Sequence, residues 1–304
     1  MNFALSLVYM SIASFLIYYY TDVLKLKAEV VTVILLFARF FDGAIDPFIG
    51  YYMDRHSLKS GKYRGYIYYW ALPSSVLFVV LFIPPPVTGQ IAALWCLFIY
   101  MVWGFCFSVM EVANLPLLTV ICEDDERNLF NTFRITSGIA AAMISSYLTF
   151  KLVAVFGNGS EKTGFFVTMA IFAAVLLCTS MLGAKNVTEK YAASENIMSF
   201  GATMTTIFRN KQLIFLYCML ICEQMAASVK LQATVYYFKY YIGRMDVLPA
   251  FFLVGALCSF LTQPIIFWAA RRFRLSRLMV GGYLCEALGM SVIWFSGRNL
   301  AAIF

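Results

Sequence analysis

The 304-residue chain is 62% hydrophobic and only 13% charged, and it contains 29 phenylalanines and 19 tyrosines. A soluble domain of this size could not bury so much apolar surface, whereas a helical protein that crosses a bilayer several times requires it. The net charge of +7 is spread over loops between apolar runs, and no nucleic-acid-binding pattern occurs, so we expect no nucleic-acid partner.

Apolar runs separated by polar breaks predict an all-α polytopic membrane protein with nine spans and the beginning of a tenth. The spans are expected near residues 3–20, 30–52, 65–83, 90–112, 130–155, 164–184, 212–240, 247–269 and 278–296. We divide the chain into a six-helix bundle at 1–185, a cytoplasmic connecting loop at 186–211 and an incomplete second bundle at 212–304.

Lysine and arginine are distributed unevenly over the predicted loops. The loops after the second, fourth, sixth and eighth spans hold most of them. Because cytoplasmic loops carry the excess of basic residues, we expect these loops and the N-terminus to be cytoplasmic. The predicted location is the plasma (inner) membrane.

The second apolar run carries three charged side chains in its interior. Arg39 and Asp42 are three residues apart, and Asp42 and Asp46 are four apart, so a helix places all three on one face. A charge in hydrocarbon costs at least ~2.5–3.5 kcal/mol on insertion scales, so these groups pair or line a wet cavity. One guanidinium neutralises one carboxylate, which leaves the other to hold a proton or a metal ion. The alternative is an ion pair that only fixes helix packing.

The same run resembles a known family. The pattern R-x-x-D-x-x-x-D-P-x-x-G, from Arg39 to Gly50, is similar to the second helix of the glycoside–pentoside–hexuronide:cation symporters, which belong to the major facilitator superfamily. The resemblance implies a major facilitator-type helical bundle. It also implies that Asp42 and Asp46 bind the coupling cation, and that they are metal ligands if that ion is Na⁺.

The loop that follows carries a signature of the whole superfamily. It comprises Gly50, Asp54 and Arg55, and the nearby 61–64 segment (Gly-Lys-Tyr-Arg) also resembles the family's loop. We assign these three residues, together with Arg39, a structural or gating role.

The fourth run contains W-G-F-C-F-S-V-M-E-V at 103–112, which is similar to the family pattern W-G-x-x-Y-T-I-M-D-I. The resemblance implies that Ser108 belongs to the cation site and Glu111 to the sugar site. A hydroxyl three residues before an acid lies on the same helix face and suits a hard cation. Ala113 and Leu115 replace a proline and an aromatic residue of the family. The alternative for Glu111 is a helix-end carboxylate near the acidic loop at 123–127.

Two further positions correspond to substrate contacts in the family. Arg134 matches the last residue of the pattern E-R-x-x-L-x-x-x-R, and a guanidinium is suited to bidentate capture of vicinal hydroxyls or a carboxylate. The alternative is an interfacial arginine that reaches to water. Asn2 stands where many members of the family carry an aspartate.

The seventh run adds Glu223 and Lys230, which lie two turns apart on one helix face. They pair with each other, or Lys230 faces the carboxylates of the second run; we also assign Lys230 to the substrate site. The Y-Y-F-K-Y end at 236–240 resembles the family's seventh helix and is equally typical of an aromatic belt at the membrane surface.

These patterns predict a secondary transporter and not an enzyme, because no phosphate loop, metal-ligand cluster or nucleophile–base motif occurs. We expect symport of a sugar or glycoside with Na⁺ or H⁺ by alternating access, with no cofactor beyond the ion, in a monomer surrounded by membrane lipid. The alternatives are a relative that moves a lipid or an organic acid, and a polytopic receptor or scaffold.

The last residues, 301–304, begin an apolar segment after a polar turn. A segment this short cannot cross ~30 Å of hydrocarbon at about 1.5 Å per residue. We therefore expect the chain to be a piece of a longer protein with three more spans. The 304-residue chain alone is expected to insert into the membrane without ion-driven uptake.

Overall fold

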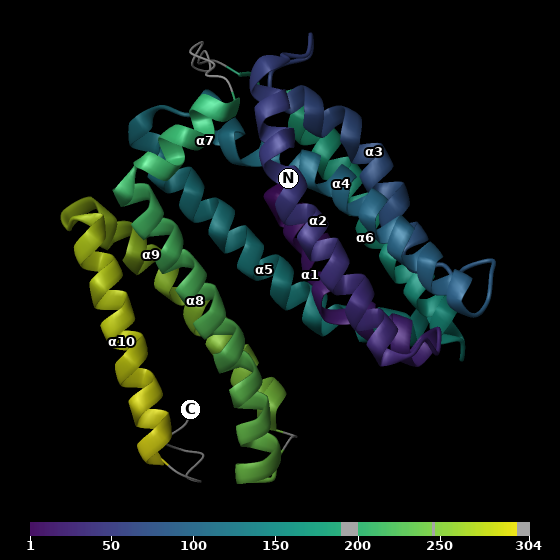
Figure 1. The fold of residues 1–304 in the computed structure, drawn as a ribbon. Coiled ribbons are helices and arrows are strands. Elements are labelled where there is room, and N and C mark those ends of the chain that lie inside the picture. The colour runs from purple at the N-terminus through teal and green to yellow at the C-terminus, as the bar shows by residue number, and fades with distance from the viewer. Residues whose placement is uncertain (190–199, 245–246, 297–304) are drawn as a thin grey trace. The chain divides into compact units, whose positions relative to one another are not determined.

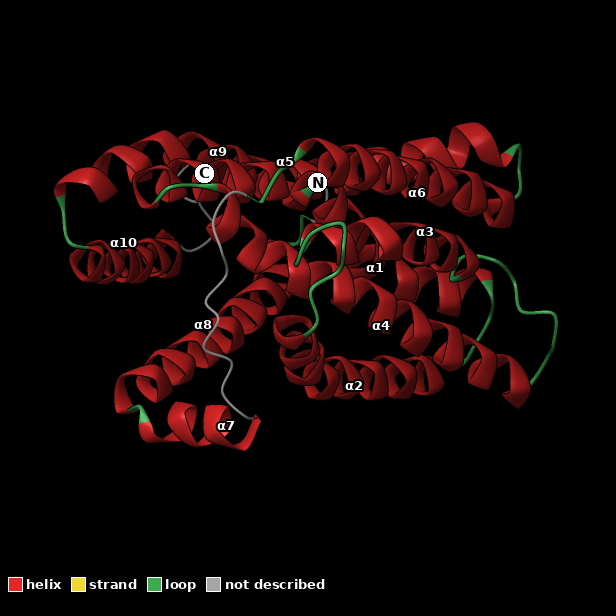
Figure 2. Cartoon of the chain, turned by 90° about the horizontal axis from the view of Figure 1, so that it is seen from above, coloured by secondary structure: helices red, strands yellow, loops and turns green. Residues whose placement is uncertain are grey.

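The computed structural model describes residues 1–189, 200–244 and 247–296, and they form two compact units that divide between Ile197 and Met198. Each unit is described by itself. Every regular element of the described residues is a helix, as Figure 2 shows. The predicted all-α class is confirmed.

The first unit contains six long helices and one short π-helix (Figure 1). Their bounds are α1 Asn2–Tyr18, η1 Tyr19–Val23, α2 Ala28–Arg55, α3 Arg64–Val80, α4 Gln90–Ile121, α5 Asp124–Gly157 and α6 Glu161–Asn186. In this unit α1 packs along α5 and α6, α2 packs along α4, and α3 contacts both α4 and α6. This arrangement places α2 and α4 side by side, which matters for the site below.

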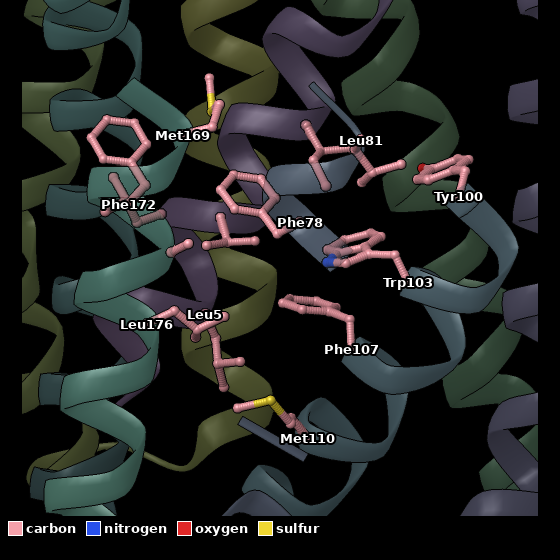
Figure 3. Close-up of a cluster of buried hydrophobic side chains, with 14 of the residues drawn as sticks. Leu5, Phe78, Leu81, Tyr100, Trp103, Phe107, Met110, Met169, Phe172 and Leu176 are labelled. Carbon is pink, nitrogen blue, oxygen red and sulfur yellow. The ribbon is translucent and has the colours of Figure 1, made fainter. Parts of the chain in front are cut away.

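An apolar core fills the space between these helices. Phe78 of α3, Leu5 of α1 and Phe172 of α6 are among the buried side chains that meet there, as Figure 3 shows. At one end of the unit α5 and α6 approach closely because residue 164 is glycine. A Cβ on Gly164 would lie 2.3 Å from the Val153 carbonyl oxygen, so no other residue fits without a shift of the backbone.

The second unit has four helices and a π-helical turn. Their bounds are α7 Phe200–Arg209, α8 Lys211–Tyr236, η2 Tyr237–Ile242, α9 Leu248–Arg272 and α10 Leu275–Ser296. Phe238 is buried at the junction of η2 and α9, against Val247 and Phe251. The helix α7 lies inside the 186–211 segment that we expected to connect the two bundles, so this segment contains a short helix. The division of the chain into two bundles and a connecting segment stays a prediction.

The described helices support membrane insertion without fixing the number of spans. Five stretches are long and apolar enough to cross a bilayer: 2–23, 90–121, 129–157, 161–186 and 253–270. Two further helices of the first unit are not among these stretches. The helix α2 carries three charges within its apolar run, and α3, with 17 residues, is shorter than the 18 residues taken as the minimum for a span. The expected start of a tenth span, at 301–304, lies outside the described residues.

Two helix boundaries differ from the sequence-based expectation. The helix α4 continues to Ile121, nine residues beyond the predicted end at 112, because Pro116 is accommodated inside it. The helix α5 starts at Asp124, whereas we expected the acidic segment 123–127 to be a loop. Acidic residues are favourable in the first turn of a helix, where they face the positive end of its dipole.

The carboxylate of Glu189 caps the start of α3. It accepts hydrogen bonds from the backbone N–H groups of Lys62, Tyr63 and Arg64, at 2.7, 2.8 and 2.8 Å. The first N–H groups of a helix have no partner within it, and a carboxylate is a strong acceptor for them. Arg64 also donates to the Val187 carbonyl at 2.7 Å. These hydrogen bonds therefore hold the residues that follow α6 against the α2–α3 loop.

We expect Glu189→Ala to loosen the α2–α3 loop. Three buried or half-buried donors lose a charged acceptor, and each such bond is worth ~1.5–3 kcal/mol, so local opening should become roughly 10–100-fold more frequent. The readout is the rate of trypsin cleavage after Lys59 and Lys62 in the purified chain. Glu161→Ala is the control, because the Glu161 carboxylate accepts exposed bonds from the Tyr18 hydroxyl alone. Equal cleavage rates in both variants would contradict the role of the cap.

Candidate functional site

The helix α2 presents Arg39, Asp42 and Asp46 toward α4, as the three- and four-residue spacings predict. Pro47 lies inside the same helix. Proline has no N–H to give to the carbonyl four residues earlier, here that of Gly43, so the α2 ladder is interrupted between the two aspartates. The helix itself continues through Pro47 from Ala28 to Arg55, and the Gly43 carbonyl oxygen that lacks this bond could serve as an additional ion ligand beside the two carboxylates.

The facing helix α4 contributes Ser108, which is buried, and Glu111, which is exposed to solvent. The close approach of the two helices depends on Gly104. A Cβ at this position would lie 2.6 Å from Oδ1 of Asp42. The Asp42 carboxylate therefore occupies the space that a side chain at residue 104 would need.

The structure brings all five of these polar side chains to one cavity of about 170 Å³ between α1, α2 and α4. Its lining residues are Tyr9, Ile12, Arg39, Asp42, Asp46, Tyr100, Trp103, Gly104, Phe107, Ser108 and Glu111. Residues predicted separately from the second and fourth apolar runs thus share one site. The prediction that they bind ion and substrate stays a prediction.

The two aspartates each keep an unpartnered oxygen. Oδ1 of Asp42 and Oδ1 of Asp46 are buried and have no hydrogen-bond partner. Within the described residues no ion pair joins Arg39 to either carboxylate; its guanidinium lies 5.5 Å from the centre of the Tyr9 ring and donates a long bond of 3.5 Å to the Tyr9 hydroxyl. The packing ion pair that the sequence left open is therefore not formed. Buried carboxylate oxygens without partners are where a proton or a cation would bind.

Aromatic rings form the wall of the cavity beside the carboxylates. Tyr100 stacks on Trp103 with ring centres 5.8 Å apart, and Trp103 stacks on Phe107 at 4.8 Å, as the column of rings in Figure 3 shows. Phe107 in turn faces Tyr9 at 6.5 Å. The Trp103 indole nitrogen is buried without a hydrogen-bond partner. Flat apolar faces with one unused donor are suited to a ring that carries hydroxyl groups.

Asn2 and Arg134 meet at a separate point, where α1, α4 and α5 come together. The Asn2 side-chain amide donates to the Arg134 carbonyl at 2.8 Å, and its oxygen accepts from the Asn114 amide at 3.2 Å. Neither Asn2 nor Arg134 lines the cavity of the aspartates. Asn2 is therefore engaged in joining three helices in this structure.

Lys230 belongs to the second unit. It forms an ion pair with Glu286 of α10, while Glu223 accepts a hydrogen bond of 3.0 Å from the Tyr283 hydroxyl. Of the two alternatives for Lys230, the pairing with Glu223 is therefore not formed, because each of the two side chains has a partner on α10. The structure does not describe the side chains of Tyr236 and Lys239 in the aromatic segment 236–240.

The loop residues lie at the end of α2, away from the cavity. Asp54 accepts a hydrogen bond of 3.1 Å from the Tyr63 hydroxyl, and Arg55 lies over the Tyr51 ring at 4.6 Å. Burial, together with the nearby Asp54 carboxylate, raises the pKa of Tyr63 to about 12, so this tyrosine stays a donor at neutral pH. Gly50 faces Val112 of α4: a Cβ placed on Gly50 would lie 3.7 Å from Cγ1 of Val112, which is an ordinary van der Waals distance.

Sequence reasoning missed the aromatic wall and the Glu189 cap. Tyr100, Trp103 and Phe107 are three and four residues apart, so their shared helix face was readable from the sequence. Tyr9 is on another helix, and nothing in its spacing indicated that it faces Arg39. Glu189 follows the end of α6 and meets a loop 125 to 127 residues earlier, which no local pattern could indicate.

The family model described as "MFS/sugar transport protein" matches residues 2–304. The chain belongs to this family. Membership, together with the long apolar helices, makes this MFS protein a multi-pass membrane protein of a transporter family. The resemblance to the glycoside–pentoside–hexuronide:cation symporters is confirmed by this match and by relatives that are named as symporters.

Three curated relatives illustrate what the chain is similar to. An isoprimeverose transporter of Lactiplantibacillus pentosus is 26% identical over 98% of this chain and 63% of its own length. A putative glycoside/cation symporter of Escherichia coli is 24% identical over 80% of this chain and 54% of its own length. A putative 2,3-dihydroxypropane-1-sulfonate exporter of Salmonella typhimurium is 27% identical over 93% of this chain and 63% of its own length. The chain thus spans between 54% and 63% of the length of these relatives.

Proposed function

We propose that this MFS protein is a secondary active transporter that couples the movement of a sugar or glycoside to that of Na⁺ or H⁺. The observation that carries the proposal is the cavity between α1, α2 and α4, in which two half-buried carboxylates, each with one buried and unpartnered oxygen, share the lining with a hydroxyl and an aromatic wall. Relatives named as glycoside/cation symporter and isoprimeverose transporter support it.

The ion is held by Asp42 and Asp46, with Ser108 as a third oxygen donor. These are hard oxygen ligands, which suit Na⁺, and a carboxylate with no partner suits a proton equally well. Two acids on one helix face repel each other when both are ionised, so a cation between them relieves repulsion.

The substrate lies against the aromatic rings on the other side of the same cavity. Glu111 provides a hydrogen-bond acceptor there. Arg134, Asn2 and Lys230 complete the contacts in the conformations of the transport cycle that bring them to the substrate. Ion and sugar then share one cavity, so each raises the affinity for the other.

Transport follows from alternating access of two helical halves around this site. We propose that the N-terminus and the even-numbered loops face the cytoplasm, as the distribution of basic residues indicates. We further propose that the protein is a monomer in the plasma (inner) membrane.

An organic anion is the second candidate substrate. Two relatives are named as a putative sulfoquinovose importer and a putative 2,3-dihydroxypropane-1-sulfonate exporter. Arg39 lines the cavity and has no ion pair with Asp42 or Asp46 within the described residues, so its guanidinium is available to a sulfonate or carboxylate.

A binding panel tests the proposal. The purified chain is incubated with radiolabelled pentosides, hexosides, a hexuronide and a sulfonated sugar, in NaCl or choline chloride and at two pH values. We expect one class to bind, and Na⁺ or acidic pH to tighten its binding. If the bound ligand is insensitive to both ions, the coupling proposal fails. Preference for the sulfonated sugar, lost in Arg39→Gln, would select the second candidate.

Gradient-driven uptake separates a transporter from a receptor. Because the 304-residue chain alone is expected to show no ion-driven uptake, the vesicles come from cells that produce the longer protein of which we expect it to be a piece, and they are given an inward Na⁺ or H⁺ gradient and the bound ligand. A transporter accumulates it, whereas a receptor binds and accumulates nothing.

A further inference from the structure

A second and larger cavity lies at the end of the first unit at which α2 and α4 begin. We call it the α2/α4 groove. Its walls are the linker before α2, the first turns of α2 with Val30 and Val33, the loop that starts at Pro84, and the first turns of α4 with Ala93 and Leu94. The volume of about 890 Å³ is within the range of small-molecule sites, ~300–1,000 Å³. No residue of the proposed transport site lines it.

The walls of the α2/α4 groove are mainly apolar, and its rim is basic. Lys25, Lys27 and Lys162 reach the groove from two different segments, and all three are exposed. None of them forms an ion pair within the described residues. Glu29 is the acid among the lining residues. With the Glu29 carboxylate counted, the lining residues of the groove still carry a net positive charge.

The position of the groove combines two environments. The lysines are on the linkers and first turns at the helix ends, where lipid headgroups and water meet the protein. The apolar wall continues along α2 and α4, where Val33 is 50% exposed and Leu94 is 65% exposed. A soluble anion would use the lysines and leave the apolar wall bare. An occupant with an anionic head and an apolar tail uses both.

We propose that the α2/α4 groove is a binding site for one anionic phospholipid. Its phosphate is held among Lys25, Lys27 and Lys162, and one acyl chain lies along Val33 and Leu94. In the proposed orientation these linkers lie on the outer side of the membrane, so the lipid belongs to the outer leaflet; its headgroup is recognised by the same chemistry as in the basic pockets known between transmembrane helices on the cytoplasmic side. A lysine that only reaches to water needs no groove beside it, whereas here three lysines surround one cavity from two segments of the chain. The site is independent of the proposed transport function.

The test is lipid titration of the purified, delipidated chain followed by native mass spectrometry. Dioleoyl phosphatidylglycerol and dioleoyl phosphatidylcholine have the same acyl chains and differ in headgroup charge. We expect one phosphatidylglycerol to bind more tightly than phosphatidylcholine. In the triple variant Lys25→Gln, Lys27→Gln, Lys162→Gln, phosphatidylglycerol binding should weaken by about 100-fold, because each lysine near an anionic head contributes roughly fivefold.

Two further variants distinguish the groove from a general attraction to charge. Ala93→Trp keeps the three lysines and fills the apolar wall, so it should also lose the tight lipid. Lys151→Gln removes a lysine of α5 that does not line the groove, and it should bind the lipid as the unchanged chain does. Unchanged phosphatidylcholine binding and unchanged helical circular dichroism show that the variants are folded.

Several results would overturn the proposal. These are equal affinity for the two lipids, tight phosphatidylglycerol binding by the triple variant or by Ala93→Trp, and full displacement of the lipid by excess inorganic phosphate, which would identify a soluble-anion site. If the unchanged chain proved to be a dimer, and Ala93→Trp made it a monomer with no change in lipid binding, the groove would be assigned to a second copy of the chain.

Discussion

Asp42→Asn and Asp46→Asn are each expected to abolish the stimulation of sugar binding by the coupling ion while part of the sugar binding remains. Each change removes one negative charge from a pair of carboxylates with unpartnered, buried oxygens. A charge within ~4 Å of a cation in a partly buried site is worth several kcal/mol, so ion affinity should decline by about 100-fold. The aromatic wall is unchanged, which is why the sugar still binds.

The measurement is sugar affinity in the presence and absence of Na⁺, and at two pH values, for each variant. Asp22→Asn is the control: Asp22 is an exposed carboxylate of η1 that accepts a bond from the Thr21 hydroxyl and does not line the cavity. Ion stimulation that persists in both cavity variants would remove Asp42 and Asp46 from the coupling site.

Gly104→Ala should have an effect nearly as large, although it changes no charged or polar group. The new Cβ would lie 2.6 Å from Oδ1 of Asp42. Such a distance is too short for two non-bonded atoms, so the carboxylate must rotate away from α4 or the two helices must separate. In either case the ligands no longer converge, and we expect ion affinity to decline by ~10–100-fold, because a misplaced ligand loses much of its contribution.

The matched control for this prediction is Gly43→Ala. Gly43 is next to Asp42 in sequence, and a Cβ there meets nothing within 4 Å. The same type of substitution, made on α2 beside Asp42 and not on α4, should therefore leave ion binding intact and stabilise α2 by about 1 kcal/mol through the higher helix propensity of alanine. If Gly104→Ala binds the ion as Gly43→Ala does, the close contact between residue 104 and Asp42 has no functional role.

The polar residues of the site were predictable because their spacing in the sequence places them on one face of a helix. Arg39, Asp42 and Asp46 are on one face of α2, and Ser108 and Glu111 are on one face of α4, so each group follows from local sequence. That the two groups share a cavity depends on which helices are neighbours. The family resemblance supplied this information, since spacing within one helix says nothing about its partner.

The remaining features depend on contacts between distant segments. Arg39 contacts Tyr9 of α1 and forms no ion pair with Asp42 or Asp46, which lie three and seven residues further along its own helix. Asn2 forms hydrogen bonds with groups on α4 and α5. Lys230 likewise pairs with Glu286 of α10 and not with Glu223 of its own helix. The sequence of one helix shows which of its own side chains can pair with each other. It does not show which side chains of other helices will lie close to them in the folded chain.

The most direct test of ion–sugar coupling is the reciprocity of the two affinities in the unchanged chain. Sugar affinity is measured with and without saturating ion, and ion affinity with and without saturating sugar, by isothermal titration calorimetry. If both ligands bind the cavity of Asp42, Asp46 and Trp103, each must tighten the other by the same factor, which we expect to be roughly 5–150-fold. A factor of one in both directions would contradict coupling at this site.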